Sequence, residues 1–422
     1  MIRILKTGEV SNEDIFSRTI PQAGVEDAVS DIISYVRKRG DEALFELTER
    51  FDGVKLESLA VTEEEIDEAF RLSDPEFIRV LEKAAENIRA FHEKQVRTGF
   101  SIEKDGIVTG QKILPVEKAG LYVPGGTAAY PSTVLMDSIP AKIAGVSDLV
   151  MTTPPKKDGK VAPSILAAAK IAGVDKIFKV GGAQAIAALA YGTKTVPAVD
   201  KIVGPGNAYV SEAKKQVFGK VSIDMIAGPS EILCVSDEKT DPKYLAADLL
   251  SQAEHDRMAS AVLVTDSITL AKAVREEIER QLPLLEREEI ARASIEQNGK
   301  IIVAEDLNEA VGIANALAPE HLELCVDDPF MYLEKVKNAG SVFLGRNCPE
   351  ALGDYFAGPN HTLPTSGTAR FANPLSVDDF VKKTQFAYYT KEALSKVSKD
   401  VALFAMQEGL TGHARSVLIR EE

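Results

Sequence analysis

The sequence predicts an α/β fold with mostly parallel sheets, and three observations support this fold class. Beyond Gly120, short β-branched segments alternate with alanine-rich segments of helical periodicity, which is typical of strand–helix–strand units. Several of the strand-like segments end in glycine-rich turns, as tight connections from strand to helix often do. The chain has 422 residues, so we expect two or three domains, each with its own hydrophobic core.

The expected strands are short runs of branched aliphatic residues. They lie at 148–153, 175–180, 200–204, 231–237, 260–266, 300–306, 322–328 and 341–345. The helices expected between them carry apolar residues at helical spacing. They lie at 133–146, 162–173, 182–192, 207–219, 241–256 and 307–319.

Helices are also expected at both ends of the chain. Residues 25–40 combine helical spacing with basic residues in the last turn and a closing glycine. Residues 74–99 have a proline in the first turn and predict a long helix, on which His92 lies among charged neighbours and is expected at the surface. From Ser376 onward the pattern returns to helix with little strand.

The charge balance argues against nucleic acid and membrane partners. The net charge is −15, from 49 basic and 64 acidic residues, whereas nucleic acid and anionic lipid both require a basic face. Tryptophan is absent, so a platform for stacking bases is not expected. The N-terminal residues hold no apolar stretch long enough for a signal peptide, and no segment could span a bilayer. We therefore expect a cytoplasmic protein.

The three cysteines, Cys234, Cys325 and Cys348, have the spacing of neither a disulfide framework nor a zinc knuckle. Cys234 and Cys325 lie in apolar runs and are expected to be buried in strands. Cys348 follows Asn347 in a loop. A cysteine nucleophile would need an exposed polar turn, so this sequence disfavours one.

Four glycine-rich turns follow strand-like runs: "LYVPGGTAAYPS", "KVGGAQAI", "IVGPGNAYV" and "MIAGPSEIL". A helix that starts at such a turn offers free backbone N–H groups to a phosphate, which favours a nucleotide ligand. The dinucleotide fingerprint G-x-G-x-x-G is absent, because Tyr209 replaces its third glycine. Tight turns also require glycine for backbone reasons alone, so both interpretations remain open here.

A second set of polar residues lies in four distant segments of the chain. Gln252 and His255 are three residues apart, a spacing that places two side chains on one face of a helix. They could grip one ligand together, or they could simply form a solvated helix end. The other segments contribute Glu320 and His321, Asp354 and His361, and Glu408 and His413. Imidazole, carboxylate and amide donors suit Zn²⁺ or Mn²⁺, but separation in the chain does not itself indicate a metal site.

These motifs together resemble those of a known family. The successive stretches "GLYVPGGTAAYPSTVLM", "KVGGAQAIAALAYGT", "DKIVGPGNAYVSEAKK", "IDMIAGPSEILCVSD", "ADLLSQAEHD", "APEHLEL", "GDYFAGPNHTLPTSGTAR" and "GLTGHARS" are similar to motifs of the histidinol dehydrogenases and occur in the same order. The resemblance covers nearly the whole chain and is most specific at "DMIAGPSEI" and "DLLSQAEHD". It implies a zinc- and NAD-dependent enzyme that oxidises L-histidinol through the aldehyde to L-histidine, the last step of histidine biosynthesis.

The resemblance also implies a role for each matching residue. The zinc ligands would be Gln252, His255, Asp354 and His413. His321 would be the general base, and Glu320 beside it would activate water. The substrate would contact Ser230, Gln252, His255, His321, Asp354, Glu408 and His413. NAD would contact Tyr122, Gln184 and Asn207, which lie in three of the glycine-rich turns.

The family's fold is expected to have two incomplete doubly wound (Rossmann-like) domains with smaller helical extensions at the N- and C-termini. On this chain the resemblance implies an N-terminal extension at 1–20 and a discontinuous α/β domain at 21–121 and 230–375 with most metal and substrate residues. It further implies an NAD-contacting α/β domain at 122–229 and a helical tail at 376–422. In a homodimer, the tail would carry Glu408 and His413 to the partner's active site.

The chemistry is consistent with these roles. Imidazole, with an ordinary pKa of about 6.5, can accept the hydroxyl proton near neutral pH. A carboxylate can activate the water needed for the second oxidation. Zinc would chiefly orient the substrate, whose imidazole and amine can both bind it. Two alternatives remain: a related dehydrogenase for another small alcohol, and a non-catalytic metal- or ligand-binding protein.

Overall fold

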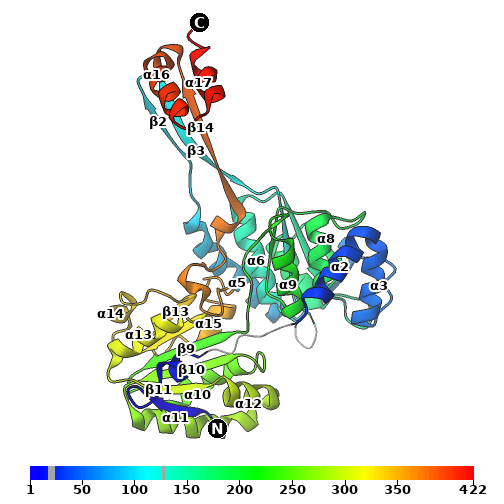
Figure 1. Cartoon of the computed structure of the whole chain (residues 1–422). Coiled ribbons are helices and arrows are strands. Elements are labelled where there is room, and N and C mark those ends of the chain that lie inside the picture. Colours follow the sequence, from blue (N-terminus) through cyan, green and yellow to red (C-terminus); the bar gives the residue numbers. More distant parts are fainter. Residues whose placement is uncertain (18–23, 126–128) are drawn as a thin grey trace. The chain divides into compact units, whose positions relative to one another are not determined.

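The computed structural model describes residues 1–17, 24–125 and 129–422. The chain divides into two compact units (Figure 1). Unit 1 comprises Met1–Gln95 and Glu117–Phe380, and unit 2 comprises Val96–Val116 and Val381–Glu422. In the described ranges, no helix is both long and apolar enough to cross a membrane.

Unit 1 contains a six-stranded parallel sheet with the order β1-β11-β10-β9-β12-β13. Its strands are β1 (Arg3–Lys6), β9 (Glu231–Ser236), β10 (Ser260–Thr265), β11 (Lys300–Val303), β12 (His321–Cys325) and β13 (Ser341–Leu344). The chain adds β10 and β11 on one side of β9, and then β12 and β13 on the other, so the sheet is doubly wound.

Helices cover both faces of the six-stranded sheet (Figure 1). One face carries α10 (Pro242–Ala253), α11 (Ile268–Gln281) and α12 (Glu288–Gln297), and the other carries α13 (Leu307–Leu317) and α14 (Pro329–Leu333). Two short helices complete this part of the chain, α1 (Asn12–Phe16) and α15 (Glu350–Tyr355). Burial on both faces explains why these strands are nearly continuous apolar runs in the sequence.

A second, five-stranded parallel sheet in unit 1 has the order β6-β5-β4-β7-β8. Its strands are β4 (Lys118–Tyr122), β5 (Asp148–Thr153), β6 (Lys176–Lys179), β7 (Lys201–Val203) and β8 (Ser222–Ile223). The crossover helices are α6 (Pro131–Ala144), α7 (Pro163–Ala172), α8 (Gly182–Tyr191) and α9 (Ala208–Val217). The chain adds β5 and β6 on one side of β4, and then β7 and β8 on the other, so this sheet is doubly wound too.

The N-terminal helices pack around the five-stranded sheet. They are α2 (Glu26–Arg39), α3 (Asp41–Asp52), α4 (Glu63–Leu72) and α5 (Pro75–His92). Helix α2 packs on α8 and α9, and α5 packs on α6 and α7. The predicted grouping of residues 21–121 with 230–375 differs from this packing. Strand β4 is central in the five-stranded sheet, α2 and α3 share a core with residues of 122–229, and α4 and α5 pack on α6 or α7.

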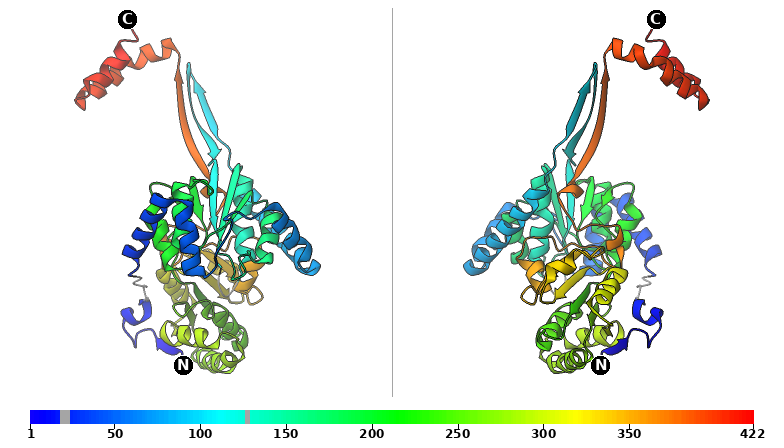
Figure 2. Two further views of the ribbon diagram at one scale, coloured as in Figure 1. Left: turned by 90° about the vertical axis from the view of Figure 1, so that its right-hand side faces the viewer. Right: turned by 90° about the vertical axis from the view of Figure 1, so that its left-hand side faces the viewer.

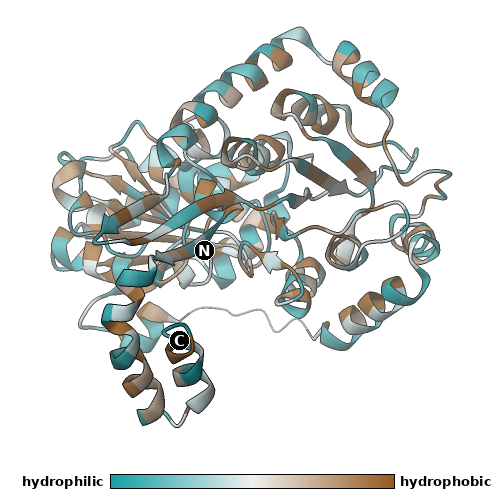
Figure 3. Cartoon of the chain, turned by 90° about the horizontal axis from the view of Figure 1, so that it is seen from above, coloured by the Kyte–Doolittle hydropathy of each residue, from teal (hydrophilic) through white to brown (hydrophobic). Residues whose placement is uncertain are grey.

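Unit 2 is a three-stranded antiparallel sheet with two helices. Strand β14 (Val381–Tyr389) pairs along its whole length with β3 (Ile107–Pro115), which pairs with β2 (Phe100–Lys104) (Figure 2). Helices α16 (Lys391–Gln407) and α17 (Thr411–Leu418) follow and pack on each other. Apolar residues, drawn in brown, occur along both helices next to the C-terminus (Figure 3).

The predicted fold class is confirmed, with differences in detail. Each expected strand and helix of the α/β region is present, and the additional elements include β1, α11, α12, α14 and α15. The tail is not wholly helical, because β14 precedes its helices. Helix α5 ends at His92, and this histidine is buried rather than at the surface.

Candidate active site

A cavity of about 290 Å³ in unit 1 brings together residues from both parallel sheets. It lies at the carboxyl edge of the five-stranded sheet, where the 204–207 turn follows β7. In the six-stranded sheet it lies at the opposite, amino edge, because Ser230 precedes β9 and His321 begins β12. The rule that ligands bind at carboxyl ends therefore describes only one of the two sheets.

His321 has a defined tautomer. Its Nδ1 lies 3.0 Å from the carbonyl oxygen of Glu231. A carbonyl can only accept, so Nδ1 carries a proton, and in the neutral ring the lone pair is on Nε2. Within the described residues Nε2 has no hydrogen-bond partner, although His321 is buried. The free Nε2 is thus the atom that can accept a proton.

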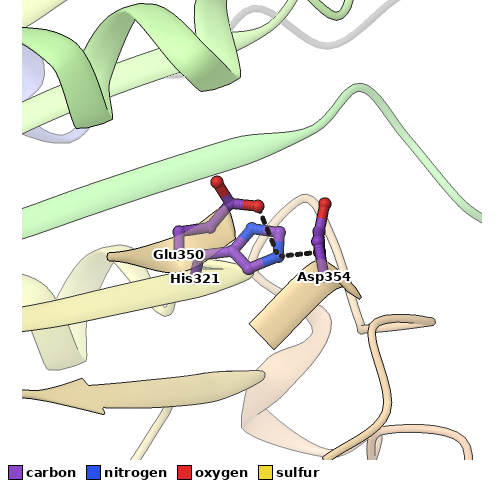
Figure 4. A group of neighbouring side chains, drawn as sticks. All are labelled: His321, Glu350 and Asp354. Atoms are coloured by element: carbon purple, nitrogen blue, oxygen red, sulfur yellow. Dashed lines mark ion pairs between the residues drawn. The ribbon is translucent and has the colours of Figure 1, made fainter. Parts of the chain in front are cut away.

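Three carboxyl groups surround the imidazole of His321. The Nε2 atom lies 3.7 Å from Oδ1 of Asp354 and 3.8 Å from Oε1 of Glu350, both on α15 (Figure 4). Oε2 of Glu320 lies 3.6 Å from Nδ1. Burial opposes a charge on the ring, but the negative potential of these groups outweighs it and raises the pKa of His321 to about 10. The carboxyl groups therefore favour the imidazolium form, and His321 can act as a base near neutral pH only where positive charge in the cavity lowers this pKa.

Glu320 lines the cavity, and a backbone hydrogen bond fixes its carboxyl group. Its Oε2 accepts a hydrogen bond of 2.8 Å from the N–H of Glu231. Burial raises the pKa of Glu320 to about 8, against the opposing influence of His321. A carboxyl group with a pKa this close to neutrality is a much stronger base than an exposed glutamate.

Gln252 and His255 line the same cavity from the end of α10. The sequence predicts Gln252 and His255 on one helix, but α10 ends at Ala253. Gln252 lies on this helix, and His255 lies in the turn that follows it. The backbone N–H of His255 donates to the carbonyl of Gln252 at 3.2 Å and fixes the turn. His255 keeps an exposed surface, and partial loss of hydration on its protein-facing side lowers the pKa of its ring.

The amide of Gln252 suggests an absent ligand. Gln252 is buried, yet neither Oε1 nor Nε2 has a hydrogen-bond partner among the described residues. Asp354 adds a charged oxygen donor: burial would raise its pKa, but His321 and His361 outweigh that and lower the pKa of Asp354 well below its usual range. An amide, a neutral imidazole and a carboxylate in one cavity are donors that zinc accepts.

Three of the predicted site residues lie at the carboxyl edge of the five-stranded sheet. Asn207 lines the cavity, and its side-chain oxygen caps α9 by accepting from the N–H groups of Tyr209 and Val210 at 3.0 and 3.2 Å. Tyr122 and Gln184 are buried and do not line this cavity. The Oη of Tyr122 accepts a 3.1 Å hydrogen bond from the N–H of Gly182, at the start of α8.

The remaining predicted residues, Glu408 and His413, belong to unit 2. Glu408 follows α16 and His413 lies on α17, and both are exposed. Unit 1 itself therefore supplies three of the four predicted metal ligands, Gln252, His255 and Asp354.

Two residues beside the site had no predicted role. Glu350 lies four residues before Asp354 on α15, and this spacing was the sequence signal that they share a helix face. Its backbone N–H donates to Glu323 at 2.7 Å. The Nδ1 atom of His361 lies 3.0 Å from the carbonyl oxygen of Asp354. Its Nε2 atom lies 3.2 Å from the hydroxyl oxygen of Thr133. Both residues hold Asp354 in place.

Asp137, a buried residue of α6, is hydrogen-bonded to a residue of the cavity wall. Its Oδ1 accepts a 2.8 Å hydrogen bond from the hydroxyl of Thr362, which lines the cavity, while Oδ2 has no partner among the described atoms. Burial, together with the nearby carboxylate of Asp224, raises the pKa of Asp137 to about 8. We therefore expect Asp137 to be neutral in the folded protein at neutral pH.

Asp137→Asn is expected to flatten the pH dependence of stability. Between the ordinary pKa of 3.8 and the raised value, the folded state binds more protons than the unfolded state. The free energy of unfolding therefore falls as pH rises, by about 1.4 kcal/mol per pH unit for one such group. Asparagine cannot titrate, so this share of the slope should disappear. Urea denaturation of both proteins between about pH 5 and pH 8 measures the slopes, and equal slopes would contradict the assignment.

The cysteines are not placed for chemistry. Cys234 and Cys325 are buried, and their thiols donate to Oε2 of Glu323 at 3.3 and 3.7 Å. Burial raises the pKa of both thiols, so they are not thiolates. Cys348 is partly exposed, and none of the three lines the cavity.

Replacing all three cysteines by serine is therefore expected to leave turnover within about twofold of the parent. Serine keeps a donor for Glu323, whereas alanine leaves that carboxyl less satisfied and should cost about 1–3 kcal/mol of stability. Steady-state NADH formation and urea denaturation of the two triple variants check these expectations. A loss of turnover of more than about 100-fold in a folded serine variant would contradict this expectation and indicate a cysteine nucleophile.

Comparison with known proteins assigns the family. A family profile described as histidinol dehydrogenase matches residues 17–421. The protein named histidinol dehydrogenase from Clostridium acetobutylicum is 54% identical over 426 residues, covering 100% of this chain and 99% of the relative. The protein of that name from Bacillus cereus is 56% identical over 412 residues, covering 97% and 95%. The crystal structure of histidinol dehydrogenase from Elizabethkingia anophelis superposes with a TM-score of 0.94 at 37% identity, covering 99% and 98%. The chain therefore belongs to the histidinol dehydrogenase family.

Proposed function

We propose that this protein oxidises L-histidinol to L-histidine in two steps at the cavity of unit 1. The site would hold one zinc ion, and each turnover would reduce two NAD⁺. Family membership supports the overall reaction. The observation that carries the mechanism is the convergence of a free imidazole Nε2, a basic carboxyl group and three metal donors on one cavity. When bound, zinc would orient the imidazole and amine of the substrate, and NAD⁺ would accept the hydrides.

The proposed zinc ligands in unit 1 are Gln252, His255 and Asp354. The unpartnered amide of Gln252 and the neutral ring of His255 fit this role, and Asp354 supplies a negative charge. A competing set exists, since His321, Glu350 and Asp354 offer ligand atoms within 4.8 Å of one another. A metal on that set would occupy the only free lone pair of His321, so we assign the metal to the first set.

His321 is the proposed base of both oxidations. In the first step its Nε2 takes the hydroxyl proton of the alcohol as the hydride leaves the same carbon, giving the aldehyde. The carboxyl groups around the ring stabilise the imidazolium. A cationic substrate and the positive nicotinamide ring bring opposing charge into the cavity, which would return the pKa of His321 toward neutrality.

Glu320 is the proposed base for hydration of the aldehyde. It takes a proton from water as the oxygen adds to the carbonyl carbon, while the imidazolium of His321 returns its proton to the former carbonyl oxygen, giving a geminal diol. His321 then accepts a diol hydroxyl proton while the second hydride leaves, and the product is the carboxylic acid. The raised pKa of Glu320 matches this task, and its hydrogen bond to Glu231 fixes its position beside His321.

The NAD-binding region is proposed at the carboxyl edge of the five-stranded sheet, with Tyr122, Gln184 and Asn207 as contacts. The order of strand addition reverses between the parallel neighbours β4 and β7, and doubly wound sheets bind nucleotides at such a position. The 204–207 turn at this position opens into the same cavity as His321. A nicotinamide ring there would face the substrate carbon.

A homodimer is proposed in which Glu408 and His413 complete the partner's site. The core shared by α16 and α17 is small and consists of alanines at positions 402, 405 and 414. Large apolar side chains on the same helices are exposed, among them Leu403 at 62% and Phe404 at 70%. Helices with so little core of their own and so much exposed apolar surface are typical of segments that dock on another subunit.

Mixing two inactive variants tests the shared site. His413→Ala removes a ligand supplied by one chain, and His321→Ala removes the base of the other. After subunit exchange, half of the dimers are mixed and each has one intact site, so recovery of up to about a quarter of the parent activity is expected. No recovery, with exchange confirmed by differently tagged chains, would mean that each site uses one chain only.

A further inference from the structure

The 204–207 turn has a backbone that must be held in one shape. Gly204 has φ +113°, and a Cβ there would lie 2.2 Å from the carbonyl oxygen of Tyr122, so only glycine fits. Gly204, Pro205, Gly206 and Asn207 all line the cavity. Small shifts of this turn would therefore alter the wall against which a cofactor binds.

The two members of a buried ion pair hydrogen-bond to the backbone N–H and carbonyl of Gly204. The N–H of Gly204 donates to Oδ2 of Asp224 at 2.8 Å, and its carbonyl accepts from Nζ of Lys214 at 2.9 Å. Lys214 and Asp224 also form a close ion pair with each other, and their side chains are only 2% and 1% exposed. Both hydrogen-bonding groups of this glycine are thus fixed by one pair of charges.

The pair is built into two further elements of the five-stranded sheet. Lys214 lies on α9, which begins directly after the turn, and Asp224 follows β8. Asp224 Oδ1 also accepts from the N–H of Met225 at 2.6 Å, and both of these residues line the cavity. A buried ion pair is weak evidence for stability, because desolvation offsets its attraction, but it is an effective device for fixing geometry.

We propose that Lys214 and Asp224 are positioning residues for NAD: their ion pair holds the 204–207 turn in the shape that receives the cofactor. This inference rests on the proposed function, in which the turn contacts NAD. Neither side chain needs to touch the cofactor. Loss of the pair should therefore weaken NAD binding while the groups that react, His321 and Glu320, and the zinc ligands stay in place.

Lys214→Met, Asp224→Asn and the double variant test the proposal. In each we expect KM for NAD to rise roughly 10- to 100-fold, the range that displacement of a positioning element by about 1 Å can cause. Turnover at saturating NAD, KM for histidinol and zinc content should change by less than about threefold. Each single variant leaves one buried charge without its partner, whereas the double variant removes both charges. A rise in KM for NAD in the double variant therefore comes from the lost hydrogen bonds to Gly204 and not from an unpaired charge.

Lys201→Met is the matched control. Lys201 lies at the other end of β7, is similarly buried with its side chain 8% exposed, and pairs with Asp379 at 3.2 Å. Its loss should leave KM for NAD unchanged. If Lys214→Met does not fold, Asp224→Asn, which keeps the size and one acceptor oxygen, carries the test. Thermal unfolding of each variant verifies that it is folded under the conditions of the kinetic measurements.

Asn207→Ala separates the proposal from the function on which it rests. If Asn207→Ala raises KM for NAD but the variants at 214 and 224 leave it within twofold, the positioning role is wrong and the NAD site stands. If Asn207→Ala also leaves KM for NAD unchanged, the turn does not bind NAD and both fail. Equal rises in KM for NAD and histidinol, or loss of zinc, would show a general structural role instead.

Discussion

His321→Ala is expected to lower turnover by roughly 10²–10⁴-fold, the usual contribution of a positioned acid–base group. The reason is geometric: His321 lines the cavity, its Nδ1 donates to the carbonyl of Glu231, and its Nε2 has no hydrogen-bond partner among the described residues. Zinc content should stay at one per chain. Both quantities are measurable on the same sample, by initial rates of NADH formation and by metal analysis.

His321→Asn sharpens this test. Asparagine can still donate to the carbonyl of Glu231 but offers no base at the position of Nε2, so it should be about as slow as the alanine variant. Near-normal turnover in either variant would remove His321 as the base. Loss of zinc in both would point instead to the competing donor set of His321, Glu350 and Asp354.

His255→Ala is expected to abolish tight zinc binding and, with it, turnover. Removing a group that merely supports a metal ligand typically costs 10- to 100-fold in metal affinity, so removing a ligand should cost about 100-fold or more. Metal analysis after gel filtration should find the variant depleted, and excess zinc should restore part of its activity. Gln252→Ala should act in the same direction.

Glu254→Gln is the matched control for the zinc prediction. Glu254 lies between Gln252 and His255 at the end of α10 but is not one of the proposed ligands. Its zinc content and turnover should match the parent. A His255→Ala protein that retains one tightly bound zinc per chain would exclude His255 as a ligand, whatever its activity.

The α/β core could be predicted because burial on both faces leaves a strong sequence pattern. Strands β9, β10 and β11 are nearly continuous apolar runs, and the helices between the strands repeat apolar residues at helical spacing. Strand β14 was missed because it is exposed along almost its whole length and mixes charged, polar and aromatic residues without alternation. Its partner β3 is distant in sequence, so local pattern could not indicate the pairing.

His92 shows how nearby charges can mislead. Charged residues lie close to it in the sequence, among them Arg89, Glu93 and Lys94, and these favour an exposed position. It also follows Leu81, Ala85 and Ile88 at helical spacing, and these form the buried face of α5. The periodicity was the better guide, because a helix presents a face rather than a stretch of sequence.

The site could be predicted only by resemblance. Gln252 and His255 are close in the chain, but their meeting with Glu320, His321 and Asp354 depends on how two parallel sheets share one cavity. The ion pair of Lys214 and Asp224 had no sequence signal, since the two residues belong to a helix and to the end of a strand. Spacing alone cannot show which distant charges meet.

The stoichiometry of NADH formed per L-histidinol consumed tests the proposed function most directly. On zinc-replete protein we predict two NADH per substrate, with activity lost on chelation and recovered on addition of zinc. One NADH with accumulation of the aldehyde would contradict the role of Glu320 in activating water. No NADH from L-histidinol would contradict the substrate itself and direct attention to other small alcohols.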